Sequence, residues 1–96
     1  MTDEELQFND GFKMISELAE DLAKQNGIIL TAILLDGGKP ARLTDYHVIE
    51  LSVGDHFVSE KLHQEEIEDY PGRVGTELTR AKIGSAIERL TVMVKG

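Results

Sequence analysis

Apolar residues at steps of three and four predict a helix at the start of the chain. The stripe consists of Phe8, Phe12, Ile15, Leu18, Ala19 and Leu22. This spacing places the side chains on one face of an α-helix. Asn26-Gly27 ends the pattern, because glycine accepts the left-handed backbone conformation found just past a helix end. We therefore expect a helix that begins near residue 3 or 10 and ends at residue 26.

The next two segments predict strands. The run IILTAILL at 28–35 is apolar at nearly every position, which favours a strand buried on both faces, under helices or in a contact between subunits. The run YHVIELSV at 46–53 alternates instead, and His47 shares a face with Ile49 and Leu51. Because that face is apolar, we interpret His47 as a core residue hydrogen-bonded to the backbone and not as a catalyst.

The last part of the chain predicts two helices. Residues 59–70 form a weak one with few apolar positions, and Pro71-Gly72 ends it because the residue before a proline avoids helical angles. A stronger pattern follows from Thr76. Its apolar face is formed by Ile83, Ala86, Ile87, Leu90 and Val94. The β-branched residues 90–95 fit either the end of this helix or a short final strand.

These elements define an α+β fold (αββαα): an N-terminal helix, a two-stranded antiparallel β unit and two helices, with a short C-terminal strand left open. We expect residues 1–96 to form one domain. With 41% apolar residues, a domain of this size has a thin margin of stability, so association with a second copy is expected. A homo-oligomer is also favoured by the apolar run at 28–35 and by the small residues Ala81, Gly84 and Ser85.

Composition excludes several classes of protein. The chain has no cysteine, which excludes disulfides and thiolate metal sites. It lacks an apolar run of membrane-spanning length, and its first residues are acidic where a signal peptide is basic, so we expect a cytoplasmic protein without a membrane partner. The net charge is −8, which disfavours binding to nucleic acid.

Basic residues gather at the end of this acidic chain. Residues 72–96 hold five basic and two acidic side chains. A helix that begins near Thr76 exposes backbone N–H groups and the positive end of its dipole at Gly75 and Thr76, with Arg73 before it and Arg80 one turn inside. This corner, residues 72–80, is our candidate anion site. The alternative is a structural corner in which both arginines pair with acids such as Glu68 and Asp69.

The same corner carries a resemblance to a known family. The element order, with GRVG at 72–75 between two helices, resembles a type II KH domain. In that family a Gly-x-x-Gly loop clamps a nucleic-acid backbone, so the resemblance implies RNA binding by Gly72, Arg73, Val74 and Gly75. The chain departs from the family in the acidic helix before the loop and in Pro71.

Patterns for catalysis and for metal binding are not convincing. His56, Glu60 and His63 would share one helical face, but the outer two would lie about 10 Å apart, too far to hold one ion. The serines lack a G-x-S-x-G context. We therefore predict no catalytic residue, no metal site and no cofactor.

Two functions of different class remain. The first is a non-catalytic acidic interaction module, a small regulator or inhibitor that binds a basic partner protein. Small inhibitors from phages and mobile elements have this size and charge, which is an analogy of type and not of family. The second is an oligomeric protein that binds or sequesters a phosphate-bearing ligand or nucleotide at the corner formed by Arg73, Gly75, Thr76 and Arg80. RNA binding by a KH-like domain is a third, less favoured function.

Overall fold

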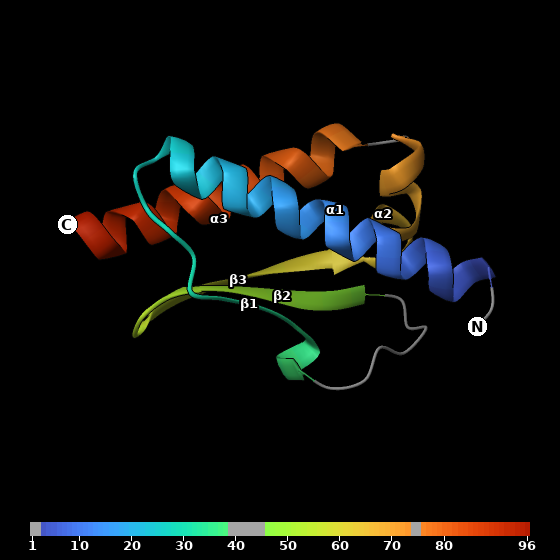
Figure 1. Cartoon of the computed structure of the whole chain (residues 1–96), viewed down its shortest axis with the longest axis horizontal. Coiled ribbons are helices and arrows are strands. Elements are labelled where there is room, and N and C mark those ends of the chain that lie inside the picture. The colour runs from blue at the N-terminus through green and yellow to red at the C-terminus, as the bar shows by residue number, and fades with distance from the viewer. Residues whose placement is uncertain (1–2, 39–45, 74–75) are drawn as a thin grey trace.

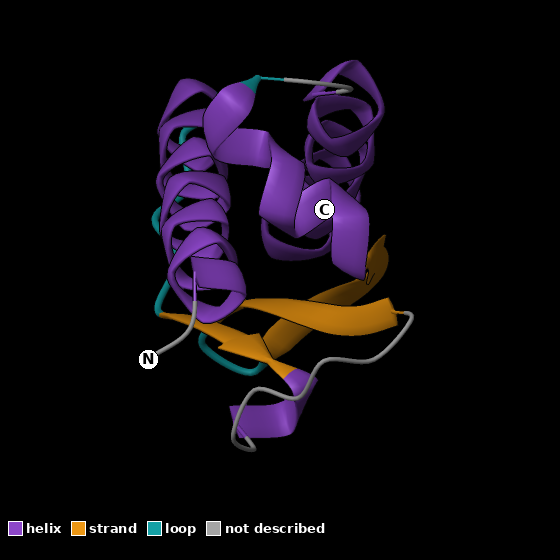
Figure 2. Ribbon diagram, turned by 90° about the vertical axis from the view of Figure 1, so that its right-hand side faces the viewer, coloured by secondary structure: helices purple, strands orange, loops and turns teal. Residues whose placement is uncertain are grey.

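A computed structural model describes residues 3–38, 46–73 and 76–96. The chain forms two layers, with the helices on one face of a three-stranded antiparallel sheet (Figure 1). All three α-helices lie on the same side of the sheet (Figure 2). The α+β class, the N-terminal helix, the antiparallel β unit and the two C-terminal helices are confirmed, whereas the β unit has three strands instead of two.

Helix α1 (Asp3–Gln25) follows the predicted stripe and begins at the earlier of the two predicted starts. Ile15 and Ala19 are fully buried. The helix ends at Gln25, and Gly27, in the turn just beyond it, has a φ of 78°. The Asn26 carbonyl accepts a hydrogen bond of 2.7 Å from Lys95 Nζ, so a cation from the other end of the chain lies at the negative end of the α1 dipole.

Strand β1 (Ala32–Leu35) is shorter than predicted and is not buried on both faces. Residues 26–31 form the turn out of α1, in which the Ile28 amide donates to the Ala23 carbonyl. Ile28 is buried, but Ile29 is 73% exposed. Among the described strands β1 pairs only with β2, so it is an edge strand of this sheet, and its residues alternate between exposed and half-buried positions.

Strand β2 (Tyr46–Val53) occupies the centre of the sheet, in the order β1-β2-β3. Its predicted alternation is confirmed, since His47, Ile49 and Leu51 point inward and are buried. The short helical turn η1 (Asp36–Gly38) follows β1. The connection that we placed at 39–45 lies outside the described residues.

Strand β3 (His56–His63) is the element that the sequence reasoning missed. The prediction of a helix over 59–70 is wrong for its first half: residues up to His63 pair with β2, and only α2 (Gln64–Asp69) is helical. The reason is the two-residue turn at Gly54-Asp55, which returns the chain along β2. It places Val58 and Leu62 on the buried face.

Helix α3 (Thr76–Lys95) extends through the tail, so residues 90–95 are helical and form no strand. Its predicted apolar face is confirmed, with Ile83, Ala86, Ile87 and Leu90 buried. The helical period explains the result, because Leu90 and Val94 continue the face that Ile83 begins. The 3₁₀ turn η2 (Tyr70–Gly72) joins α2 to the corner before α3.

The KH resemblance loses its topological basis in this arrangement. A third strand stands where the resemblance placed the first part of a helix, and the tail is helical. Of the GRVG motif, Val74 and Gly75 lie outside the described residues.

Candidate functional site

The predicted anion corner lies where η2 meets α3. Arg73 has left-handed backbone angles, with a φ of 59°, and its amide donates to the Tyr70 carbonyl at 2.9 Å. This tight turn positions Arg73 beside the start of α3, where Thr76 is the first residue and Arg80 lies one turn further along. The fourth predicted residue, Gly75, lies outside the described residues.

The structure brings three of the predicted residues together around one hollow. Its volume is about 140 Å³, and its lining is Met14, Tyr70, Arg73, Thr76 and Arg80. Both arginines are exposed, and within residues 3–38, 46–73 and 76–96 neither forms an ion pair. The predicted pairing of these arginines with Glu68 and Asp69 is therefore not observed there. Glu68 accepts a hydrogen bond from Gln64 instead.

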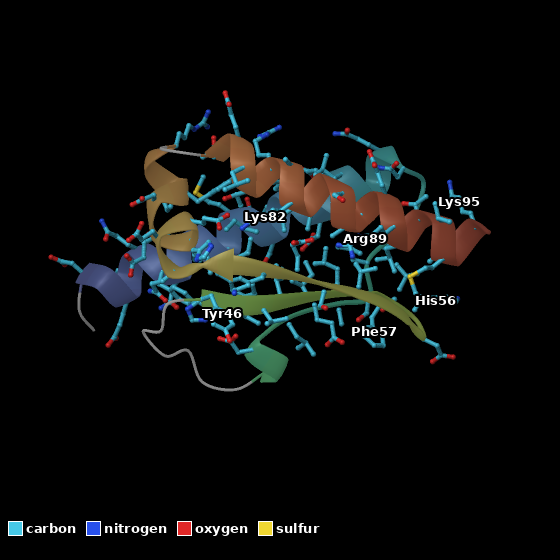
Figure 3. All side chains as sticks on the ribbon, turned by 180° about the vertical axis from the view of Figure 1, so that it is seen from behind. Tyr46, His56, Phe57, Lys82, Arg89 and Lys95 are labelled. Carbon is cyan, nitrogen blue, oxygen red and sulfur yellow. The ribbon has the colours of Figure 1, made fainter. Side chains whose placement is uncertain are left out.

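The other basic residues of α3 have partners inside the fold. Lys82 Nζ lies 2.6 Å from Glu66 Oε1, and Arg89 Nη2 lies 2.8 Å from Glu60 Oε2. Figure 3 shows both side chains between α3 and the sheet. Lys82 and Arg89 are thus neutralised by carboxylates where α3 meets α2 and the sheet, whereas Arg80 at the corner forms no ion pair among the described residues.

Glu66 is the most strongly bonded carboxylate of these pairs. Its burial alone raises the pKa, but hydrogen bonds from Lys82, the His63 amide and Thr79, together with the charge of Lys82, outweigh that cost and lower the pKa below its ordinary value. Glu66 is therefore an ionised structural residue that joins α2 to α3, and not a proton-exchanging group.

A second polar cluster, which sequence reasoning did not find, surrounds His47. The Nδ1 atom of His47 lies 2.5 Å from Asp36 Oδ2, and Nε2 lies 2.5 Å from Gln64 Oε1. The Phe8 ring packs 4.8 Å from the imidazole. His47 is a hydrogen-bonded core residue as predicted, but its partners are side chains from η1 and α2.

This cluster fixes the direction of one hydrogen bond. Gln64 Nε2 donates to Glu68 at 2.6 Å, so Gln64 must present its carbonyl oxygen to His47. His47 Nε2 therefore carries a proton and donates it. Because only 1% of His47 is exposed, the cluster is a structural tie between β2, η1 and α2, and it offers no accessible catalytic group.

The remaining sequence candidates are not brought together. His56, Glu60 and His63 lie on strand β3, where Glu60 pairs with Arg89 and both histidines are exposed. Among the described residues, no three His, Cys, Asp or Glu side chains come together in a group that could hold a metal ion. The same part of the chain contains no helix long and apolar enough to cross a bilayer.

Comparisons with protein-family models, with curated proteins and with solved structures each gave no match. The observations define the class of protein as a two-layer α+β domain, acidic in sum, with a small arginine-lined corner. The function must be argued from its surfaces.

Proposed function

We propose that this protein is a non-catalytic interaction module that binds a basic surface of a partner protein through helix α1, and so acts as a small regulator or inhibitor. The supporting observation is the division of charge in the fold. Lys82 and Arg89 are matched by the protein's own carboxylates. Three exposed acids of α1, Asp10, Glu17 and Asp21, are left available to other molecules.

Helix α1 carries seven acidic and two basic residues. Asp10, Glu17 and Asp21 are exposed and recur along one side of the helix. Among the described residues, none of the three forms an ion pair. A basic partner would gain association rate from this field, and the gain would fall as salt screens it.

To test this, a partner is captured, identified and purified. It is then titrated against the wild-type protein and against two variants with matched charge reversals. The double variant Glu17→Lys/Asp21→Lys reverses two of the seven acidic charges of α1, whereas Asp55→Lys/Glu88→Lys makes the same change in net charge elsewhere. All four residues are exposed. We expect the α1 variant to raise Kd about tenfold or more, which corresponds to about 1.4 kcal/mol, and the control variant to raise it much less.

Two results would contradict the proposal. One is an equal loss of affinity in both variants, which would mean that only net charge matters. The other is a Kd that does not rise with salt. Thermal denaturation of both variants shows whether each one is folded before the comparison is made.

A second function has a specific observation in its favour. Arg73 and Arg80 face the same hollow with Thr76, at the positive end of the α3 dipole. Paired arginines suit the oxygens of a phosphate group. Binding of a small phosphate-bearing ligand at this corner is therefore our alternative proposal.

Calorimetry with inorganic phosphate and with nucleotides separates the two functions. If the corner is the site, Arg73→Ala and Arg80→Ala abolish the heat of binding, and Lys13→Ala, which removes one exposed charge from α1, preserves it. A heat that Lys13→Ala reduces as much would indicate general attraction of anions. Absence of heat from wild-type protein with every ligand would reject the alternative.

A further inference from the structure

The two edges of the sheet differ in how they are protected. The β3 edge lies beside α3, and Lys82 Nζ donates to the Lys61 carbonyl at 3.1 Å. The strand also carries the charged residues Glu60 and Lys61. Charged side chains and covered backbone groups are the usual means by which proteins prevent further strand pairing. The β3 edge is therefore protected against pairing with another strand.

The β1 edge has none of these features. Its four residues are Ala32, Ile33, Leu34 and Leu35, and the whole segment 28–35 contains neither a charge nor a proline. Such an edge is a template for another strand. The exposed apolar side chains beside it include Ile29, at 73%, and Leu34, at 40%.

The direction of the backbone groups in β1 follows from its neighbour. The Val48 amide of β2 points to the β1 side, where it donates to Asp36 Oδ1 at 3.0 Å. Two residues further along β2, Glu50 is paired with Leu34, so Leu34 directs its N–H and C=O towards β2. By alternation, Ile33 and Leu35 direct theirs to the free side.

A groove runs between this edge and helix α1. Its volume is about 330 Å³, with one wall from Phe12, Ser16 and Glu20 and the other from residues 30–33. Phe12, Leu30 and Ile33 are half-buried apolar residues at its lining. In Figure 1 helix α1 lies above strand β1, and both are on the side that faces the viewer. A strand added to β1 would cover these side chains.

We propose that the occupant of this edge is the β1 strand of a second copy, paired antiparallel about a two-fold axis. The pairing joins two three-stranded sheets into one six-stranded sheet. A strand paired with its own copy about such an axis is self-complementary, because each copy offers the same outward N–H and C=O groups at Ile33 and Leu35.

Charge explains why a second copy would bind at this edge and not at another part of the surface. Two molecules that each carry −8 repel one another, so they approach best where the surface is neutral. Segment 28–35 is uncharged, and Glu20 is the sole charged residue among those that line the groove. The inference is independent of the proposed function, which rests on the charges of α1.

Sedimentation equilibrium tests the proposal, with protein raised from micromolar to millimolar concentration. We expect the mass to rise from 10.7 kDa towards twice that value. We also expect tighter association at higher salt, since salt screens the repulsion between like-charged copies. A basic foreign partner would show the opposite salt dependence.

The chain offers a closely matched pair of variants. Leu34 and Val48 are apolar, lie on the outer face of the same sheet and are each 40% exposed, but Val48 is on the central strand. Leu34→Lys places a charge at the new interface in both copies and should weaken the dimer about tenfold or more. Val48→Lys should leave the dimer nearly unchanged.

Amide hydrogen exchange measures directly whether the β1 edge is paired with another strand. In the dimer, exchange at Ile33 and Leu35 should slow as the concentration rises, with no equivalent change in β3. A chain that stays monomeric to millimolar concentration overturns the proposal. So does a dimer that Leu34→Lys leaves intact, or one in which these two amides exchange at the monomer rate.

Discussion

Lys82 Nζ lies 2.6 Å from Glu66 Oε1, and this ion pair fastens α3 to α2. The same carboxylate accepts hydrogen bonds from Thr79 Oγ1 at 3.0 Å and from the His63 amide at 3.1 Å. The Glu66 side chain is only 10% exposed. One carboxylate therefore joins α2, α3 and the end of β3, and all three contacts favour its ionised form.

Glu66 is expected to make the protein sensitive to acid. Because the folded-state pKa of Glu66 is lowered from its ordinary value of 4.5, its contribution is present above that value and is lost as pH falls through the lowered pKa. Glu66→Gln should cost about 1–3 kcal/mol at neutral pH. The difference from wild type should shrink at acidic pH, as measured by urea unfolding across pH.

The neighbouring Glu65 provides the control for this prediction. It is exposed on the same short helix, so Glu65→Gln should change stability little at any pH. A Glu66→Gln deficit that stays constant from neutral pH to acid would show that shape and not charge accounts for the contact.

The glycines of the two long helices should respond to alanine in opposite ways. A Cβ built on Gly11 of α1 would collide with the backbone carbonyl of Ile67 in α2, whereas one on Gly84 of α3 meets nothing within 4 Å. We expect Gly11→Ala to destabilise the fold by about 1–3 kcal/mol or more. Gly84→Ala should stabilise it by up to about 1 kcal/mol through helix propensity.

Chemical denaturation of the two variants checks this pair, because the substitution is the same and only the surroundings differ. If Gly11→Ala were as stable as wild type, α1 and α2 could not pack as closely as described. A destabilising Gly84→Ala would indicate that this position is covered, for example by another molecule.

Gly11 also has a structural role that could not be predicted from the sequence. In the sequence it is a weak point within the stripe of α1, because glycine lowers helix propensity. Its role is set by the approach of α2, which lies 56 residues away at Ile67. The stripe itself was predictable because its period depends only on neighbours along the helix.

The prediction of a helix where strand β3 lies was wrong for a related reason. Residues 59–70 offer a helix few apolar side chains to bury, chiefly Leu62 and Ile67, and the local pattern does not decide between helix and strand. The partner strand decides, since Val53 and His56 pair across Gly54-Asp55. A two-residue turn with glycine was the signal that could have indicated a hairpin.

The corner at the start of α3 was partly predictable. Arg73, Thr76 and Arg80 are close in sequence to one helix start, so their proximity follows from local geometry. Met14 comes from α1, and its place in the lining depends on how α1 packs. The freedom of both arginines was not predictable either, because Glu68 is engaged by Gln64 within α2.

Replacing His47 tests whether its cluster holds the fold together. His47→Phe keeps a ring of similar size against Phe8 but removes the donor to Asp36 Oδ2 and to Gln64 Oε1. We expect a loss of about 1–3 kcal/mol in unfolding free energy for a buried acceptor left unpaired. The Asp36 side chain is 28% exposed and can recover water, so the Gln64 carbonyl should account for most of the cost.

His56→Phe is the control for this last prediction, because His56 is exposed at the start of β3, and its unfolding free energy should stay within about 0.5 kcal/mol of wild type. Nitrogen-detected NMR of wild-type protein should show a proton on Nε2 of His47, as the direction of the Gln64 amide requires. An Nε2 without a proton would mean that Gln64 is turned and donates to the ring, and a His47→Phe variant as stable as wild type would show that the cluster adds nothing to the packing of the ring. A loss confined to His47→Phe, with the proton on Nε2, would establish that β2, η1 and α2 are tied through this imidazole.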